Sequence, residues 1–331
     1  MAYSNNLTRA EQKTLAKEKV DKALAKINTD VVSVFNNAEL PKFLKFAANF
    51  HYFDIYNVLL IYKQRPTASF IASFRTWEKF SIENWGDPNR PVFSSSQKGK
   101  GIGILVPYIL KKRSYVKDEA GQSKRKVVSY FDYHVVFVFD KEQTNGIPAP
   151  VFDWNISESP TDAEAVFNAL KSKAPFDISF SNDIDAGYNF VFNNAGENAA
   201  VVDTLLLRMQ DKNDFYKLCN NVINIFTLKI LRDIEEKYSR DDFQKIVECV
   251  SYMLSCYFGL PTEQYVFFFA SSWFKDSVAD MINVLDVVQR AVHRIIEMLE
   301  EESMFFKSLY GDSNDAINND DVFVFSNAFE F

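Results

Sequence analysis

The segment QKGKGIGILVP, residues 97–107, combines three of the chain's ten glycines with two lysines, a composition that occurs in phosphate-binding loops. A P-loop needs the pattern G-x-x-x-x-G-K-[ST] followed by a helix, so that backbone N–H groups surround the anion. Here apolar and β-branched residues follow Gly101 and Gly103, Pro107 ends the run, and no Ser or Thr follows a Gly-Lys pair. The segment therefore predicts a strand with glycines at its start, flanked by Lys98 and Lys100, and it excludes a P-loop.

Residues that could bind a metal or act as nucleophiles are sparse. The chain has three histidines, His51, His134 and His293, and no two of them lie within one helical turn, as an H-E-x-x-H zinc site requires. Three cysteines cannot all pair, and none stands in a C-x-x-C motif, which predicts buried thiols in a reducing compartment. We expect no catalytic residue, no metal and no cofactor.

Composition and charge indicate two folded parts of different character. The 331 residues are 47% apolar and 15% aromatic, which is enough for two domains with their own cores. The first residues are polar and no run of eighteen apolar residues occurs, so we expect a cytoplasmic protein without a membrane partner. Residues 1–150 carry a net charge of +9 and the remainder −16, so the first half suits a polyanion. The alternative is that the two halves attract each other.

Periodicity and turn signals place the secondary structure. The capping-box spacing from Thr8 to Glu11 predicts a helix that ends at about Ile27. Further helices are expected over 40–50, 54–64, 76–80, 162–173, 214–238, 241–258 and 276–304, and strands over 101–109 and 127–139. The basic residues between the two strands are expected to form a hairpin tip, and the three prolines of 145–162 mark a domain boundary. The acidic and aromatic end, 319–331, is either a last strand or a docking peptide.

Three blocks of the first half resemble a known family. They are FDIYNVLLIYKQRPTASFIASFRTW (53–77), GKGIGILVPYI (99–109) and FVFDKEQTNGIPAP (137–150). In this order they resemble the N-terminal single-stranded-DNA-binding domain of ArdC-type antirestriction proteins, which are found on plasmids, phages and conjugative transposons. The resemblance implies an α+β domain that binds single-stranded DNA, with the matched polar residues Asn57, Gln64 and Gln143 among the residues that contact it.

Binding of single strands without sequence preference needs a positive groove for phosphates and flat side chains on which bases stack. The candidate cations are Lys63, Arg65, Arg75, Lys98 and Lys100, with Lys111, Lys112 and Arg113 from the hairpin. The candidate stacking residues are Tyr52, Tyr56, Phe74 and Trp77. The alternative for these aromatic residues is the core, because their spacing is helical.

The second half resembles the companion domain of the same family, which has a zinc-metallopeptidase-like (SprT-like zincin) fold. The resemblance rests on SYMLSCYFGLPTEQYVFFFASSW (251–273) and the long final helix. In the family an H-E-x-x-H helix precedes this block and a glutamate on the next helix completes the metal site. The corresponding positions here hold Asn224, Ile225, Leu228 and Glu248, so the resemblance implies a degenerate site without metal.

Together these features predict an α+β protein of two domains, residues 1–150 and residues 151–331, the second mostly helical and a pseudoenzyme. The predicted function is single-stranded DNA binding in the cytoplasm of a bacterial host, in antirestriction, DNA protection, replication or transfer of a mobile element, plasmid or phage. An alternative is a scaffold or anti-defence protein whose acidic second domain binds a host defence or replication protein. A nuclease of unrecognised mechanism is a further alternative.

Overall fold

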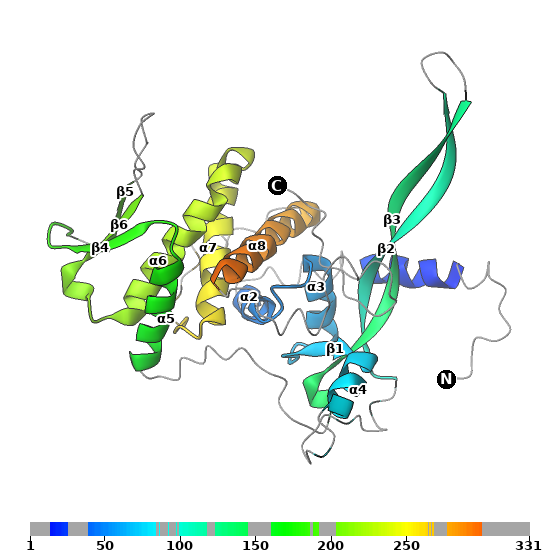
Figure 1. Ribbon diagram of the computed structural model, residues 1–331, viewed down its shortest axis with the longest axis horizontal. Helices are drawn as coiled ribbons and strands as arrows, with labels where there is room; N and C mark the ends of the chain where they lie inside the picture. The colour runs from blue at the N-terminus through cyan, green and yellow to red at the C-terminus, as the bar shows by residue number, and fades with distance from the viewer. Residues whose placement is uncertain are drawn as a thin grey trace. The chain divides into compact units, whose positions relative to one another are not determined.

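The computed structural model describes residues 14–25, 39–83, 86, 92, 97, 99–117, 123–144, 160–185, 188–191, 203–263, 265, 267 and 277–299 (Figure 1). The chain forms two compact units, and each combines segments that are distant in sequence. The first unit contains the described residues from Tyr56 to residue 144 together with a helix over residues 14–25. The second contains residues 39–55 and the described residues from 160 to 299.

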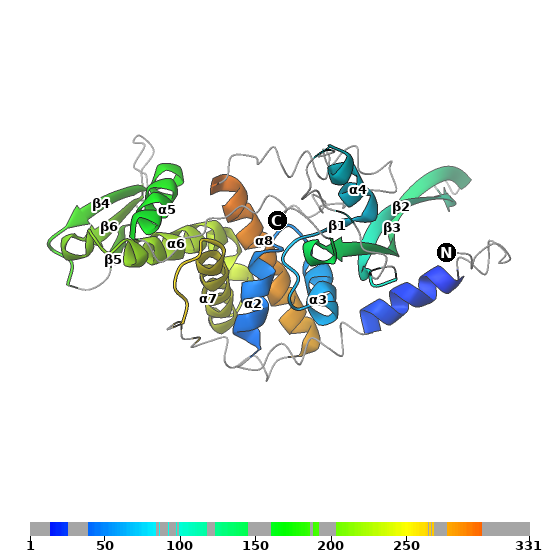
Figure 2. The ribbon, with the colours of Figure 1, turned by 90° about the horizontal axis from the view of Figure 1, so that it is seen from below.

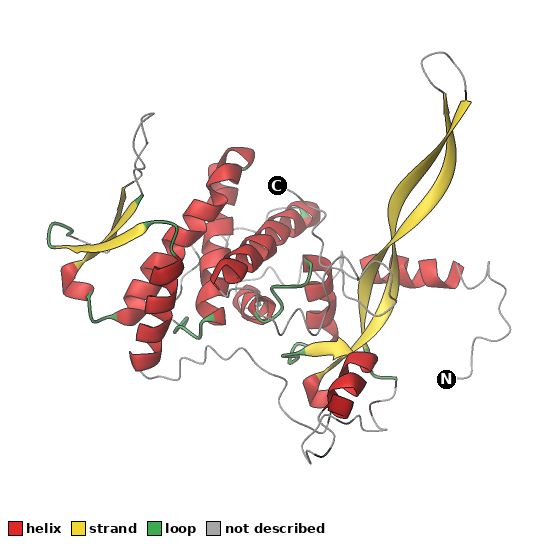
Figure 3. Cartoon of the chain, viewed as in Figure 1, coloured by secondary structure: helices red, strands yellow, loops and turns green. Residues whose placement is uncertain are grey.

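The first unit is built on one antiparallel sheet. Its elements are α3 (Ile55–Gln64), β1 (Ile71–Ser73), α4 (Phe74–Glu83), β2 (Ile102–Lys117), β3 (Ser123–Asp140) and the short 3-10 helix η2 (Lys141–Gln143). The strand order is β1-β3-β2, so that β2 is an edge strand (Figure 3). β1 pairs only with the last residues of β3, from Ser73 opposite Val138 to Ile71 opposite Asp140.

The two long strands form a hairpin in continuous register, from Ile102 opposite Val138 to Lys117 opposite Ser123. It is drawn as a long twisted ribbon in Figure 1. Both strands are longer than the predicted 101–109 and 127–139, because the basic segment that was expected to form the tip continues the pairing. That part of the prediction is therefore wrong: Lys111, Lys112 and Arg113 lie on β2.

Local sequence explains where the helices of this unit begin and end. The helix α3 ends at Gln64 because Pro66, one residue beyond Arg65, has no N–H to continue the ladder. The helix α4 begins beside Ser73, whose Oγ accepts a hydrogen bond of 3.0 Å from the backbone N–H of Thr76. The apolar face of α3, with Val58 and Ile61 fully buried, packs in the core of the unit.

The second unit is mostly helical. Its helices are α2 (Leu40–Ala48), α5 (Pro160–Lys173), α6 (Phe215–Leu231), α7 (Arg240–Tyr257) and α8 (Val278–Leu299), with the 3-10 helices η3 (Met209–Asp211) and η4 (Arg232–Lys237). Both α2 and α8 pack on α7, and α5 packs on α6 (Figure 2). A small sheet of order β4-β6-β5 joins β4 (Asp177–Ser181) in parallel and β5 (Tyr188–Val191) in antiparallel orientation to β6 (Thr204–Arg208).

The predicted helices from 40 to 304 all correspond to helices of the structure, and the mixed α/β character is confirmed. The strands β1, β4, β5 and β6 were not predicted. The capping box at Thr8 and the end 319–331 lie outside the described residues. None of the described helices is long and apolar enough to cross a membrane.

Candidate nucleic-acid interface

Two side-chain amides on α3 cover the outer edge of β2. The Asn57 side chain donates to the carbonyl oxygen of Leu105 (2.8 Å) and accepts from its N–H (2.7 Å). Gln64, the last residue of α3, forms the same pair of hydrogen bonds with Gly103, at 2.8 and 2.9 Å. Because β2 is an edge strand, these amides satisfy backbone groups that a further strand would otherwise satisfy. Asn57 and Gln64 therefore hold α3 against the sheet.

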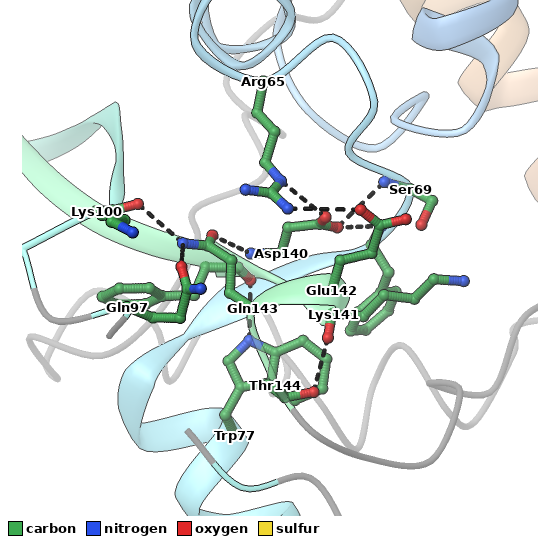
Figure 4. Close-up of polar contacts among 12 residues, drawn as sticks. Arg65, Ser69, Trp77, Gln97, Lys100, Asp140, Lys141, Glu142, Gln143 and Thr144 are labelled. Atoms are coloured by element: carbon green, nitrogen blue, oxygen red, sulfur yellow. Dashed lines mark hydrogen bonds and ion pairs between the residues drawn. The ribbon is translucent and has the colours of Figure 1, made fainter. Parts of the chain in front are cut away.

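A second cluster joins the end of β3 to the loop before β2 (Figure 4). The fully buried Asp140 carboxylate accepts hydrogen bonds from the backbone N–H groups of Ser69 and Phe70 and from Arg65 Nε (3.0 Å). The Gln143 side chain accepts from the Asp140 N–H and donates to the Lys100 carbonyl oxygen (2.9 Å). Gln143 thus positions Lys100, which is exposed, beside the first residues of β2, and Arg65 holds Asp140 at the end of β3.

Trp77 belongs to the core of this unit. Its ring is 2% exposed, lies edge-on to Phe70, and donates from Nε1 to the carbonyl oxygen of Phe139 (2.9 Å). Stacking of a base on Trp77 would require this packing to open. We therefore revise its predicted role from stacking to positioning. Tyr52, which is also buried, lies in the second unit.

The sheet exposes a different set of rings, which we call the aromatic face. On β3, Tyr133 and Phe137 are 46% and 54% exposed, and Phe74, the first residue of α4, is 51% exposed. Phe74 lies edge-on to Phe139, with ring centroids 6.4 Å apart. Residues 133, 137 and 139 alternate along the strand, so they share one face of the sheet. The aromatic face is therefore Phe74, Tyr133, Phe137 and Phe139.

The glycines of the segment 97–107 leave room for the rings of the aromatic face. Gly103 lies directly opposite Phe137 in the register. A Cβ at Gly101 would lie 2.9 Å from the Cβ of Phe137 and 3.2 Å from the ring of Phe139. Because Gly101 has no side chain, the side chains of Phe137 and Phe139 can pack closely against the backbone at this position. Of this face, only Phe74 was predicted from the sequence to stack on bases. The alternation of aromatic residues in YHVVFVF, opposite the glycines, is the signal that could have identified the others.

The predicted cations fall into three groups. Arg75 and Lys100 are exposed near the aromatic face, and Lys63, on α3, is half-buried. Arg65 is an ion-pair partner of Asp140 and also approaches Glu142, with 3.5 Å between Nη2 and Oε2. Lys111, Lys112 and Arg113 occupy register positions opposite Ser129, Val128 and Val127. Lys98 lies outside the described residues, and Tyr56, on α3, is 40% exposed.

The four positions compared with a metal site lie on neighbouring helices of the second unit. Asn224, Ile225 and Leu228 are on α6, where Ile225 is 1% exposed, and Glu248 is on α7. The Glu248 carbonyl oxygen accepts a hydrogen bond from the Tyr265 hydroxyl (2.9 Å). Among the residues that the structure describes, no three His, Cys, Asp or Glu side chains gather as metal ligands. The degenerate metal site remains a prediction.

The thiols of this unit are poor nucleophiles. Burial, followed by the nearby Glu248 charge, raises the pKa of Cys249 well above its ordinary value. Burial likewise raises the pKa of Cys219 to about 12. Both residues are buried free thiols, as predicted from their spacing. Because the thiolate is the reactive form, neither thiol is activated for attack.

Comparison with known proteins gives one structural likeness. No protein-family model and no curated protein matches the sequence. The chain is similar to the metal-free crystal structure of the antirestriction protein ArdC from plasmid R388, with 16% identity over 75% of this chain and 86% of that chain. The TM-score of this superposition is 0.42.

Proposed function

We propose that the first unit binds single-stranded DNA without strong sequence preference, with bases stacked on the aromatic face and phosphates beside Lys100 and Arg75. The observation that carries this proposal is the exposure of Phe74, Tyr133 and Phe137 around one face of the sheet. Large apolar rings seldom remain in water in such a group unless they bind something. Unpaired bases offer flat faces to such rings, whereas paired bases do not.

Other residues of the predicted site hold the elements that carry this face. Asn57 and Gln64 bind the edge of β2, Gln143 binds the Lys100 carbonyl oxygen, Arg65 binds Asp140 at the end of β3, and Trp77 donates to the Phe139 carbonyl oxygen. In this proposal they are positioning residues. Lys63 and Tyr56 lie on α3 and would contact a strand that continues past the edge of β2.

The sequence resemblance to ArdC-type proteins adds a biological setting to the proposal. On this basis we propose that the protein belongs to a mobile element or phage and that it protects or escorts single-stranded DNA in antirestriction, replication or transfer. We further propose that the second unit is not an active metallopeptidase, because Ile225 occupies the position expected for the general base. Zinc analysis of the purified protein tests this point, and a stoichiometric metal would overturn it.

Stacking can be distinguished from simple hydrophobic contact at Phe137. Stacking contributes roughly 1–3 kcal/mol per base, which is about 5- to 150-fold in affinity. Phe137→Leu keeps an apolar side chain but removes the flat ring, so affinity for labelled oligo-dT should fall by about that factor, whereas Phe137→Trp should retain it. The measurement is fluorescence polarisation. The control is Val191→Ala, a change at another exposed apolar residue, on β5 of the second unit.

The phosphate contact of Lys100 is tested by salt dependence. For single strands the slope of log K against log salt changes by about 0.7 for each neutralised phosphate. Lys100→Gln should therefore flatten the slope by about 0.7. If oligo-dT does not bind at low salt, or binds Phe137→Leu as tightly as wild type, the proposed function is wrong. Binding of a host protein by the acidic unit would then favour the alternative.

A further inference from the structure

The outer part of the hairpin differs from its base in chemistry. We call residues 111–117 of β2 and 123–129 of β3 the arm. Its pairing runs from Lys111 opposite Ser129 to Lys117 opposite Ser123. β1 pairs with β3 only at residues 138–140, so the arm is a two-stranded ribbon in the part of the chain that the structure describes.

Cations and aromatic residues are separated along the hairpin. From 111 to 126 the sequence has seven cations, two acidic residues and a single aromatic residue, Tyr115. The cations are Lys111, Lys112, Arg113, Lys117, Lys124, Arg125 and Lys126. The exposed rings Tyr133 and Phe137 lie towards the other end, near β1. The base of the hairpin thus offers stacking surface and the arm offers positive charge.

This separation matches the two forms of a nucleic acid. A single strand has free base faces, which suit the aromatic face. A duplex hides its base faces and presents phosphates at high charge density, which suit cations without rings.

The dimensions are also compatible with a duplex. The major groove of B-form DNA admits a two-stranded β-ribbon. With about 3.3 Å per strand residue, the hairpin extends roughly 45 Å from Gly103 to Lys117, and the arm alone about 20 Å. One turn of duplex is about 34–36 Å. The arm therefore reaches into the first turn of a duplex that begins where a single strand leaves the aromatic face.

We propose that the arm binds a nucleic-acid duplex and that the protein recognises the junction between a single strand and a duplex. The junction part rests on the proposed function, whereas duplex binding by the arm does not. The arm contacts phosphates along the groove, and the aromatic face holds the adjoining unpaired bases. Affinity for a junction then exceeds affinity for either form alone.

The test uses the full chain and three labelled DNAs: dT15, a 12-base-pair hairpin, and the same hairpin with a dT15 tail. The variant replaces Lys111, Lys112 and Arg113 by Gln. Wild type should bind the tailed hairpin at least about tenfold more tightly than dT15, and the variant should lose this preference while binding dT15 as wild type does. Since each phosphate contact to a duplex contributes about 0.9, the salt slope for the tailed hairpin should flatten by about 2.7.

The matched control replaces three exposed cations of the second unit, Lys171, Lys212 and Lys237, by Gln, which changes the net charge equally. It should leave both affinities within about twofold of wild type. Shortening the DNA hairpin to 4 base pairs should remove most of the preference of the wild-type protein for the tailed DNA over dT15, because the arm then extends past the duplex.

Each other result has a definite meaning. Equal losses on dT15 and the tailed hairpin would place the arm on the single strand and overturn the inference, and unchanged binding of both would remove the arm from the interface. Loss of duplex binding in the arm variant, with no binding of dT15 by wild type, would support the arm and refute the proposed single-strand function. If the control variant lost affinity for the tailed hairpin to the same extent, the arm would act only through the net charge of the protein, and the inference would be overturned.

Discussion

At the scale of single residues, Asn57 and Gln64 perform one task in two environments. Each forms two hydrogen bonds with the backbone of one β2 residue. Asn57 is 4% exposed, whereas Gln64 is exposed. The same chemistry should therefore contribute differently to stability, because water can replace only the outer pair of bonds.

Replacing each amide by Leu separates the two environments. Asn57→Leu leaves the buried N–H and carbonyl of Leu105 without partners, and each unsatisfied group costs about 1–3 kcal/mol, so the free energy of unfolding should fall by about 2–6 kcal/mol. Gln64→Leu should cost about 1 kcal/mol or less, since water can reach Gly103. Urea unfolding monitored by circular dichroism measures both. Equal losses would contradict the difference in environment.

The sequence singles out Asn57 and Gln64, but it does not show which groups they bind. Asn57 and Gln64 were named as possible DNA contacts because they are polar residues within a matched block. That they satisfy the edge of a strand some 40 residues later is a nonlocal fact that spacing does not reveal. The same holds for Trp77, whose hydrogen bond to Phe139 depends on how α4 packs on β3.

At the scale of elements, a histidine pair joins the segment after α2 to α8. The Nδ1 atoms of His51 and His293 are 3.2 Å apart, and the Nε2 of His293 is 3.3 Å from a Glu297 carboxylate oxygen. The two Nδ1 atoms share one hydrogen bond, in which one ring donates and the other accepts. Burial, followed by the charge of His293, holds the pKa of His51 well below 6.5. His51 is therefore neutral at pH 7.

This pair predicts loss of stability in mild acid. Between pH 6.5 and the lowered pKa of His51, the unfolded chain binds a proton that the folded chain does not, so the free energy of unfolding falls as the pH falls. The slope from this residue is up to about 1.4 kcal/mol per pH unit. Glu297, whose pKa is lowered by its hydrogen bond from His293, acts only below about pH 4.5. Urea unfolding at pH 7.0, 6.0 and 5.0 should show a smaller decline for His51→Gln than for wild type, and parallel declines would contradict the assignment.

Elements differ in how far sequence specifies them. The helices were predicted because their apolar residues recur every three or four positions, as on α8, where Leu285, Val288 and Val292 are buried. The strands β4, β5 and β6 have four or five residues each, too few for an alternation to stand out, and β4 pairs in parallel with a strand more than 20 residues later. The basic segment between the two predicted strands was expected to be a hairpin tip, because most charge runs are solvated, yet cross-strand pairing continues through it to Lys117 opposite Ser123.

At the scale of the whole molecule, the chain enters the second unit twice. Residues 39–55 belong to it with the described residues from 160 to 299, and the first unit is formed largely by the chain between them. The predicted limits 1–150 and 151–331 follow the proline-rich stretch and thereby assign α2 to the other half. The apolar side of α2, with Phe43, Leu44 and Ala48 fully buried, packs on α7, and the Gln289 side chain donates to the Phe50 carbonyl oxygen (2.7 Å).

The discontinuous unit predicts the behaviour of fragments. Residues 31–55 joined by a Gly-Ser linker to 150–302 should unfold in one cooperative thermal transition. Residues 150–302 alone should unfold at a lower temperature or fail to fold, because the surface of α7 that α2 covers is exposed to water. Thermal melts followed by far-UV circular dichroism compare the two. Identical melting curves would show that α2 contributes nothing to this unit.

The side-chain amides at the edge of β2 also affect how copies of the chain meet. An open edge strand is a template on which strands of other molecules can add, and it is a common starting point for aggregation. At Gly103 and Leu105 the backbone groups that would recruit such a strand are already bonded to α3. These hydrogen bonds therefore block strand addition at Gly103 and Leu105, next to the exposed aromatic rings of the same sheet.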